Sequence, residues 1–209
     1  MLKTISASLL LFSPSCIAWE NDEPWFCHDI DCPNFTNSTI DNIEIREYPP
    51  ALWASTNVSS TNIIEADNIG FDRLFDYISG ANDESIAIDM TSPVTSRVIP
   101  GAGPNCNSTF IVSFFVPFEY QDNGPPEPTS SLVYIESREA LNVAVSEFSG
   151  YAPQAEIIAK AAQMEVEVED SQDLQIDNSY DDSWFFAGYD PPFRLTDRHN
   201  EVWVPVINK

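Results

Sequence analysis

Residues that could support catalysis are few in this chain of 209 residues. Its two histidines, His28 and His199, stand outside any H-E-x-x-H pattern, and G-x-S-x-G, Walker and G-x-G-x-x-G motifs are missing from the sequence. Carboxylates are so numerous that a catalytic pair would leave no recognisable signature. We therefore expect a protein that is not an enzyme, with an unrecognised hydrolase as the enzymatic alternative.

Positive charge is rare in the sequence. Nine Lys and Arg stand against 33 Asp and Glu, for a formal net charge of −24. Such a surface repels phosphate backbones and anionic headgroups, so we expect neither nucleic acid nor a membrane as a partner. Calcium or basic extracellular proteins are the expected weak counterions. The segment "GYDPPFRLTDRHNEVWV" nevertheless places Arg194 and Arg198 beside His199. These residues either close the fold or border a site that requires positive charge.

Metal binding is the next chemistry to consider. "CHDIDC", together with His199, could form a cluster, but its spacing matches no zinc pattern and lacks the C-x-x-C-H of covalent haem attachment. The acidic stretch 165–182 contains no EF-hand loop. We predict no metal site there and expect a solvated acidic helix end and loop, with a specific calcium site as the alternative.

The first 18 residues have the layout of a secretory signal peptide, with cleavage expected after Ala18. We therefore expect a secreted, extracellular protein that begins at Trp19. In an oxidising compartment two of the three remaining cysteines are expected to pair, and the sequence does not say which. These candidates are Cys27, Cys32 and Cys106. The sequons that could carry glycans begin at Asn34, Asn37, Asn57 and Asn107.

Periodicity predicts the elements that must position these residues. Alternating patterns predict strands at "IEIREY", "ALWASTNV", "SIAIDM", "VTSRVI", "TFIVSFFVPF", "LVYI", "LNVAVSEF", "SWFFAGY" and "EVWVPV". Helical spacing appears over 66–79, and again after Gly150. The buried face of this second helix is predicted to carry Ile157, Ala161, Met164 and Val168. Taken coarsely, the order of elements is ββαββ, repeated once. It predicts an α+β fold with both helices packed on a largely antiparallel sheet.

We expect one domain over 43–209, preceded by an irregular leader at 19–42. Each half of the duplicated pattern is under about 100 residues and would bury the two faces of its own sheet poorly. A division into two independent domains is therefore disfavoured.

Five segments in order resemble successive signatures of the SOUL haem-binding protein family. They are "EIREYPPALWAST", "FDRLFDYISGAND", "IDMTSPVT", "GYAPQAEI" and "GYDPPF…RHNEVWV", and they span about residues 43–206. The resemblance implies a twisted antiparallel sheet curled into a distorted β-barrel, with two helices and an internal repeat. It also implies non-covalent binding of haem or another porphyrin in an apolar groove, without a catalytic step.

Carried over to this sequence, the resemblance implies a groove along the first helix and near the loop before the last strand. The cofactor-binding candidates are Phe71, Arg73, Leu74, Phe75, Ile78 and Arg194. Apolar side chains would contact the porphyrin disc, and Arg73 and Arg194 would face its propionates. Arg198 and His199 would serve the turn and the strand end. The alternatives are an ordinary amphipathic core stripe on the helix and surface ion pairs for the two arginines.

Two positions depart from the family pattern. Glu47 stands where some members have an iron-ligating histidine, and a carboxylate is a poor substitute for imidazole. Asp76 stands at a helix position that is basic in a porphyrin-binding member, and an acid there would weaken propionate binding. The competing function is an acidic extracellular matrix or interaction protein that keeps the fold without binding haem.

Overall fold

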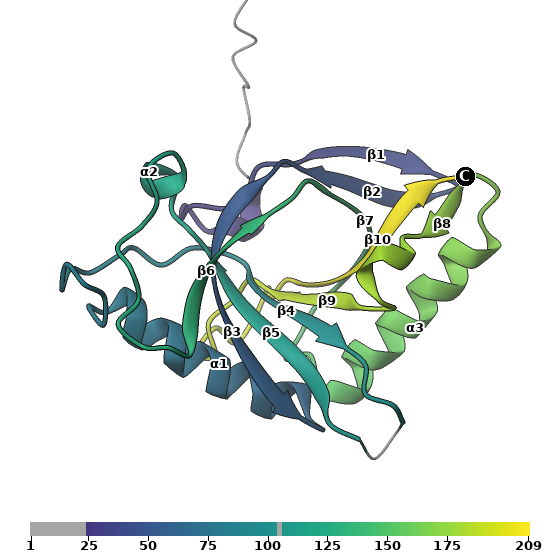
Figure 1. Cartoon of the computed structure of the whole chain (residues 1–209). Helices are drawn as coiled ribbons and strands as arrows, with labels where there is room; N and C mark the ends of the chain where they lie inside the picture. Colours follow the sequence, from purple (N-terminus) through teal and green to yellow (C-terminus); the bar gives the residue numbers. More distant parts are fainter. Residues whose placement is uncertain (1–23, 104–105) are drawn as a thin grey trace, which may run out of the picture.

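The computed structural model describes residues 24–103 and 106–209 (Figure 1), so the predicted signal peptide and Trp19 lie outside the described residues. The strands are β1 (Thr36–Ile40), β2 (Ile43–Tyr48), β3 (Ala51–Ser60), β4 (Val94–Ile99), β5 (Ser108–Phe115), β6 (Val133–Arg138), β7 (Leu141–Phe148), β8 (Leu174–Ile176), β9 (Trp184–Gly188) and β10 (Asn200–Asn208). The helices are α1 (Ile63–Ile78), α2 (Phe118–Gln121) and α3 (Gln154–Asp170), with 3-10 turns η1 (Trp25–Cys27) and η2 (Asn178–Tyr180).

The ten strands form one antiparallel sheet, as the alternating patterns predict. Its order is β1-β2-β7-β10-β9-β4-β5-β3-β6, with β8 pairing beside β10. The edge strands β1 and β6 do not pair with each other, so the sheet curls but remains open. The α+β fold and the twisted sheet are therefore confirmed.

The order of the elements along the chain shows the predicted duplication. One half runs β2-β3-α1-β4-β5 and the other runs β6-β7-α3-β9-β10. The halves meet where β4 pairs with β9. The first strand of each half pairs with the other half, since β2 lies against β7 and β6 lies against β3. Because of this exchange, neither half can complete its sheet alone.

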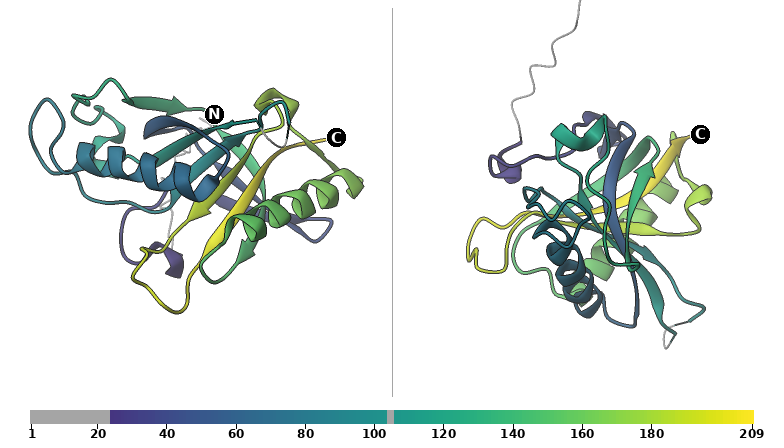
Figure 2. Two further views of the ribbon diagram at one scale, coloured as in Figure 1. Left: turned by 90° about the horizontal axis from the view of Figure 1, so that it is seen from below. Right: turned by 60° about the vertical axis from the view of Figure 1, so that its left-hand side comes forward.

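Both long helices cover the same face of the sheet (Figure 2, left). The helix α1 packs on β3, β5 and β6, whereas α3 packs on β7, β8 and β10. The predicted inner face of α3 is correct, since its buried side chains are Ile157, Ala161, Met164 and Val168.

The opposite face is covered at one end by the N-terminal segment. Phe26, Cys27 and Cys32 pack there against buried aromatic residues such as Trp203. Cys27 and Cys32 form a disulfide with Cα atoms 5.9 Å apart, which resolves the open cysteine pairing. Cys106 is free and exposed.

Three local predictions were wrong. The leader contains strand β1, because residues 36–40 pair with β2 although their side chains are mostly exposed and give no apolar alternation. "SIAIDM" is not a strand, because Ile88 packs under the end of α1 and its N–H donates to the Ile78 carbonyl. The acidic stretch 165–182 contains the short strand β8, which pairs with the C-terminal end of β10.

Candidate functional site

The helix α1 is held close to the sheet by features of its own sequence. Asn62 caps its start, and the side-chain oxygen accepts hydrogen bonds from the Ile64 and Glu65 amides. Gly70 faces β5, where a Cβ atom would come within 2.4 Å of the Val112 side chain. Only glycine allows this close approach, so Gly70 sets the depth at which the helix lies.

Of the four apolar candidates on α1, two lie near the surface and two lie in the core. The rings of Phe71 and Phe75 stack with centroids 5.7 Å apart, and Phe75 is 48% exposed. Leu74 and Ile78 are buried with Phe114 in the core under the helix. Phe75 is therefore the exposed member of the predicted stripe, whereas Phe71 is partly buried against Phe114.

Arg73 extends from α1 towards β3. Its Nη1 donates to the Thr56 hydroxyl at 3.2 Å and to the Asn57 carbonyl at 3.0 Å. Both acceptors are uncharged, so the guanidinium keeps its positive charge uncompensated by an ion pair among the described residues. Asp76 lies on the same helix and is exposed.

Arg194 lies in the loop between β9 and β10. Its Nε lies 3.1 Å from the Asp190 carboxylate, and its Nη1 lies 3.3 Å from His28 Nδ1. The side chain remains 36% exposed. Arg194 is thus positioned by the buried Asp190 and by the N-terminal segment.

Arg198 and His199 have the structural roles predicted for them. Arg198 donates hydrogen bonds to the carbonyls of Gly150, Asp190, Pro191 and Arg194. His199 is buried, and its ring stacks on Phe26 at 4.2 Å. The segment "GYDPPFRLTDRHN" therefore closes the fold through Arg198 and His199, and it also holds Arg194, which is partly exposed beside Asp190.

The structure does not bring all the candidates together. Among the described residues, no hydrogen bond, ion pair or ring contact joins Arg194 to the α1 candidates, and the loop projects from the body of the molecule in both views of Figure 2. Two neighbours of Arg194 were missed by sequence reasoning, since Phe193 is 82% exposed and Leu195 is 76% exposed. The sequence signal that could have identified them is their position on either side of Arg194, directly after Pro191 and Pro192.

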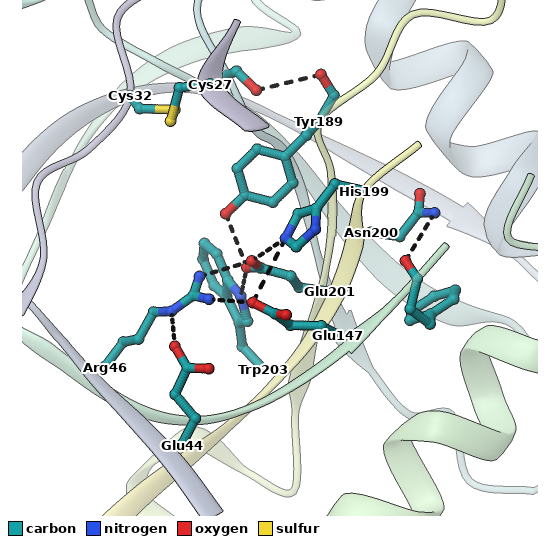
Figure 3. A network of polar contacts seen from close by, with 12 residues as sticks. Cys27, Cys32, Glu44, Arg46, Glu147, Tyr189, His199, Asn200, Glu201 and Trp203 are labelled. Carbon is teal, nitrogen blue, oxygen red and sulfur yellow. Dashed lines mark hydrogen bonds and ion pairs between the residues drawn. A yellow bond between two sulfur atoms is a disulfide. The ribbon is translucent and has the colours of Figure 1, made fainter. Parts of the chain in front are cut away.

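A buried polar network on the other face of the sheet was also missed (Figure 3). Arg46 is 2% exposed and donates to Glu44 at 2.7 Å, to Glu147 at 2.8 Å and to Glu201 at 2.7 Å. Glu201 is fully buried and lies 2.5 Å from His199 Nε2. Alternation in β2 sets Arg46 on the polar side of a half-buried strand, opposite Ile43 and Ile45, so it did not predict that Arg46 would be buried.

The network keeps Glu201 ionised. Burial raises the pKa of Glu201, but the hydrogen bond from His199 and the charge of Arg46 outweigh it, so the pKa lies below its usual value. Tyr189 and Trp203 also donate to this carboxylate, at 2.8 and 2.6 Å. Glu147, His199 and Glu201 could together present metal ligands, but the Arg46 guanidinium already bonds both carboxylates. The cluster is a structural ion-pair network.

Asp67 is an ionisable group on α1 without a cation partner among the described residues. The Ser96 hydroxyl donates to its carboxylate. Burial raises the pKa of Asp67 to about 7, against 3.8 for an ordinary aspartate, and the Ser96 hydrogen bond only partly offsets this. The first helix therefore contains a group that titrates near neutral pH.

The remaining sequence candidates lie on the surface. Glu47 is exposed on β2, whereas α1 packs on β3, β5 and β6, so Glu47 is not part of the helix surface. All four sequon asparagines (34, 37, 57 and 107) are exposed. Within the described ranges, no helix combines the length and apolar character needed to cross a bilayer.

Solved structures similar to this chain share its fold at low sequence identity. The EcmrR C-terminal domain superposes with a TM-score of 0.58 at 12% identity, over 84% of this chain and 99% of that one. SAV2435 bound to tetraphenylphosphonium superposes with a TM-score of 0.50 at 13% identity, over 79% and 93% of the chains. At these identities the likeness concerns the fold alone.

Sequence relatives are closer. Heme-binding protein 2 of Homo sapiens is 39% identical over 166 residues, covering 77% of this chain and 76% of the relative. Heme-binding protein 1 of Sus scrofa is 34% identical over 161 residues, covering 77% and 82%. A model of the SOUL heme-binding protein family matches residues 30–205. The chain therefore belongs to the SOUL heme-binding protein family.

Proposed function

We propose that this protein binds haem or a related tetrapyrrole non-covalently, as a binding protein without catalytic activity. The observation that carries the proposal is its membership of the SOUL family over residues 30–205, together with relatives named heme-binding proteins 1 and 2. The absence of a recognisable catalytic motif supports a binding role.

The proposed contact surface is α1 with the β9–β10 loop. A porphyrin is a flat apolar disc with two carboxylates, and the stacked pair Phe71 and Phe75 offers a flat aromatic surface. Arg73 and Arg194 are the cations proposed for the propionates, and Phe193 and Leu195 add exposed apolar area beside Arg194.

The described residues fit the disc and its acidic edge better than they fit the iron. His199 is stacked on Phe26 in the core, and His28 pairs with Asp190 at 2.8 Å. Glu47 is a carboxylate on a different part of the sheet. We therefore propose that affinity comes from apolar contact and charge at the rim, with a dissociation constant near 1 μM, or about −8 kcal/mol.

Charge reversal at the rim tests this site. Arg194→Glu removes an attractive contact and adds a repulsive one, and we expect hemin to bind at least tenfold more weakly. Lys160→Glu is the matched control, because it makes the same charge change on α3, away from the proposed contact surface. Phe75→Ser should weaken binding similarly through lost apolar area. If the Arg194 and Lys160 variants bind hemin equally well, Arg194 is not at the site.

We also propose that the protein is secreted, with a mature N-terminus at Trp19. The layout of residues 1–18 supports this proposal, and a disulfide within the N-terminal segment agrees with an oxidising compartment. N-terminal sequencing of the extracellular protein tests both statements. Recovery of a chain beginning at Met1 from the medium would exclude this cleavage site. The exposed sequons make glycans on that protein a further expectation.

A further inference from the structure

Two of the six arginines in the sequence line one hollow that the tetrapyrrole proposal does not use. Arg97 on β4 and Arg138 on β6 border this space of about 500 Å³, together with Phe185 and Tyr180. Ser96 and Val98, on either side of Arg97, face the helix side, where Ser96 bonds Asp67. Because strand side chains alternate, Arg97 points to the face opposite α1.

Arg138 has unused hydrogen-bonding capacity at this place. Its Nη2 donates to the Ser113 hydroxyl at 3.1 Å and to Glu136 at 3.3 Å. Its Nη1 is buried and has no hydrogen-bond partner among the described residues. The Thr95 hydroxyl, paired in register with Ser113, is buried without a partner as well. Buried donors are nearly always satisfied in proteins, so Nη1 of Arg138 is an unmet donor at the edge of the hollow.

Arg97 adds a second positive charge and, unlike Arg138, which pairs with Glu136 at 3.3 Å, it has no carboxylate partner among the described residues. Its Nε donates to the Ser183 hydroxyl at 2.7 Å and its Nη2 donates to the Tyr180 carbonyl at 3.1 Å. Both partners are uncharged, and within the described part of the chain Arg97 forms no ion pair. Burial lowers the pKa of Arg138, the charge and hydrogen bond of Glu136 partly offset this, and repulsion from Arg97 adds a smaller lowering effect.

Three carboxylates also border the hollow, but among the described residues only Glu136 is bonded to one of the two arginines. Glu136 is the one carboxylate of the described residues bonded to Arg138, and it also accepts from the Ser55 hydroxyl at 2.9 Å. Asp177 accepts from the Ser179 amide and caps η2. Glu139 is exposed to solvent. An additional acceptor between the guanidinium groups would relieve both the repulsion and the unmet donor.

We infer that this hollow binds a small organic anion, with its acidic group between Arg97 and Arg138 and its apolar body against Phe185 and Tyr180. Guanidinium groups bind carboxylate or sulfonate oxygens through paired, charge-assisted hydrogen bonds. Aromatic walls with a few placed polar groups are typical of small-molecule sites. The site is separate from the proposed tetrapyrrole surface, because α1 covers the other face of the sheet.

Two probes that share a ring system test the inference. One is 8-anilinonaphthalene-1-sulfonate, which is anionic, and the other is N-phenyl-1-naphthylamine, its uncharged counterpart; both are titrated by fluorescence into the folded protein. We expect the anionic probe to bind at least tenfold more tightly. Arg97→Gln should weaken binding of the anionic probe at least fivefold and change the affinity for the neutral probe less than twofold. Lys160→Gln should change neither affinity.

Arg138→Lys is the second variant, used in case Arg97→Gln does not fold. It keeps the charge and loses the paired geometry, so we expect a smaller but measurable loss of preference for the anionic probe. Equal binding of the two probes to the wild-type protein would overturn the inference. An undiminished preference for the anionic probe in both variants would also overturn it. A loss of preference in Arg194→Gln as large as in Arg97→Gln would do the same, because the anion would then bind at the β9–β10 loop.

Discussion

Asp67 gives a pH-dependent stability that can be worked out from one carboxylate. Its pKa is 3.8 when unfolded and about 7 in the folded protein. Because the pKa is higher in the folded protein, the folded state binds the proton more tightly than the unfolded chain does. The protein is therefore most stable with respect to this group below pH 3.8, and that stability is lost as the pH rises to 7. At 1.36 kcal/mol per pKa unit, the raised pKa lowers the free energy of unfolding by about 1.7 kcal/mol at pH 5, where the folded carboxyl is still protonated, and by about 4 kcal/mol at pH 8, where it is ionised.

The substitution Asp67→Asn removes this ionisation and keeps an oxygen that can accept from Ser96. The difference in free energy of unfolding between variant and wild type should therefore become more favourable to the variant by about 2–3 kcal/mol between pH 5 and pH 8. Urea unfolding at both pH values measures it. Asp76→Asn, an exposed carboxylate on the same helix, is the control and should give the same difference at both pH values. A pH-independent effect of Asp67→Asn would refute the reasoning.

Three further predictions concern stability, each measured by urea unfolding. Arg46→Gln should destabilise the protein by roughly 3–5 kcal/mol, because Glu201 would remain buried without its cation; a loss below about 1 kcal/mol would show that the network is not coupled. Removing the Cys27–Cys32 disulfide with Cys27→Ser and Cys32→Ser should cost about 2 kcal/mol for so short a loop, and no change would mean that the bridge does not restrain the segment. Gly70→Ala should cost about 1–3 kcal/mol through overlap with Val112, unless β5 shifts without penalty.

Much of the fold could be predicted because its signals are local. Strand alternation and helical spacing located the sheet and both long helices, and the repeated order ββαββ predicted the duplication. The exchange of β2 and β6 between the halves could not be predicted, since pairing partners far apart in sequence leave no mark on local periodicity. "SIAIDM" shows a related limit: its alternation is genuine, but Ile88 packs under the end of α1, a contact that the alternation does not reveal.

The candidate site was predictable only in part. Helical spacing identified the α1 stripe, but it did not separate the exposed Phe75 from the fully buried Leu74, because the depth of the helix depends on Gly70 and β5. The network of Arg46 and Glu201 joins residues 155 positions apart. In a chain with 33 acids, no sequence signal distinguishes the buried ones from those in solvent.

Titration of the purified protein with hemin, followed at the Soret band, tests the central proposal most directly. We predict saturation at one equivalent with a dissociation constant near 1 μM, and a spectrum without the low-spin features of bis-histidine ligation. The buried His199 and the Asp190-paired His28 are the reason for the second expectation. An absorbance that rises linearly without saturation would contradict haem binding, and a low-spin bis-histidine spectrum would contradict the proposed geometry.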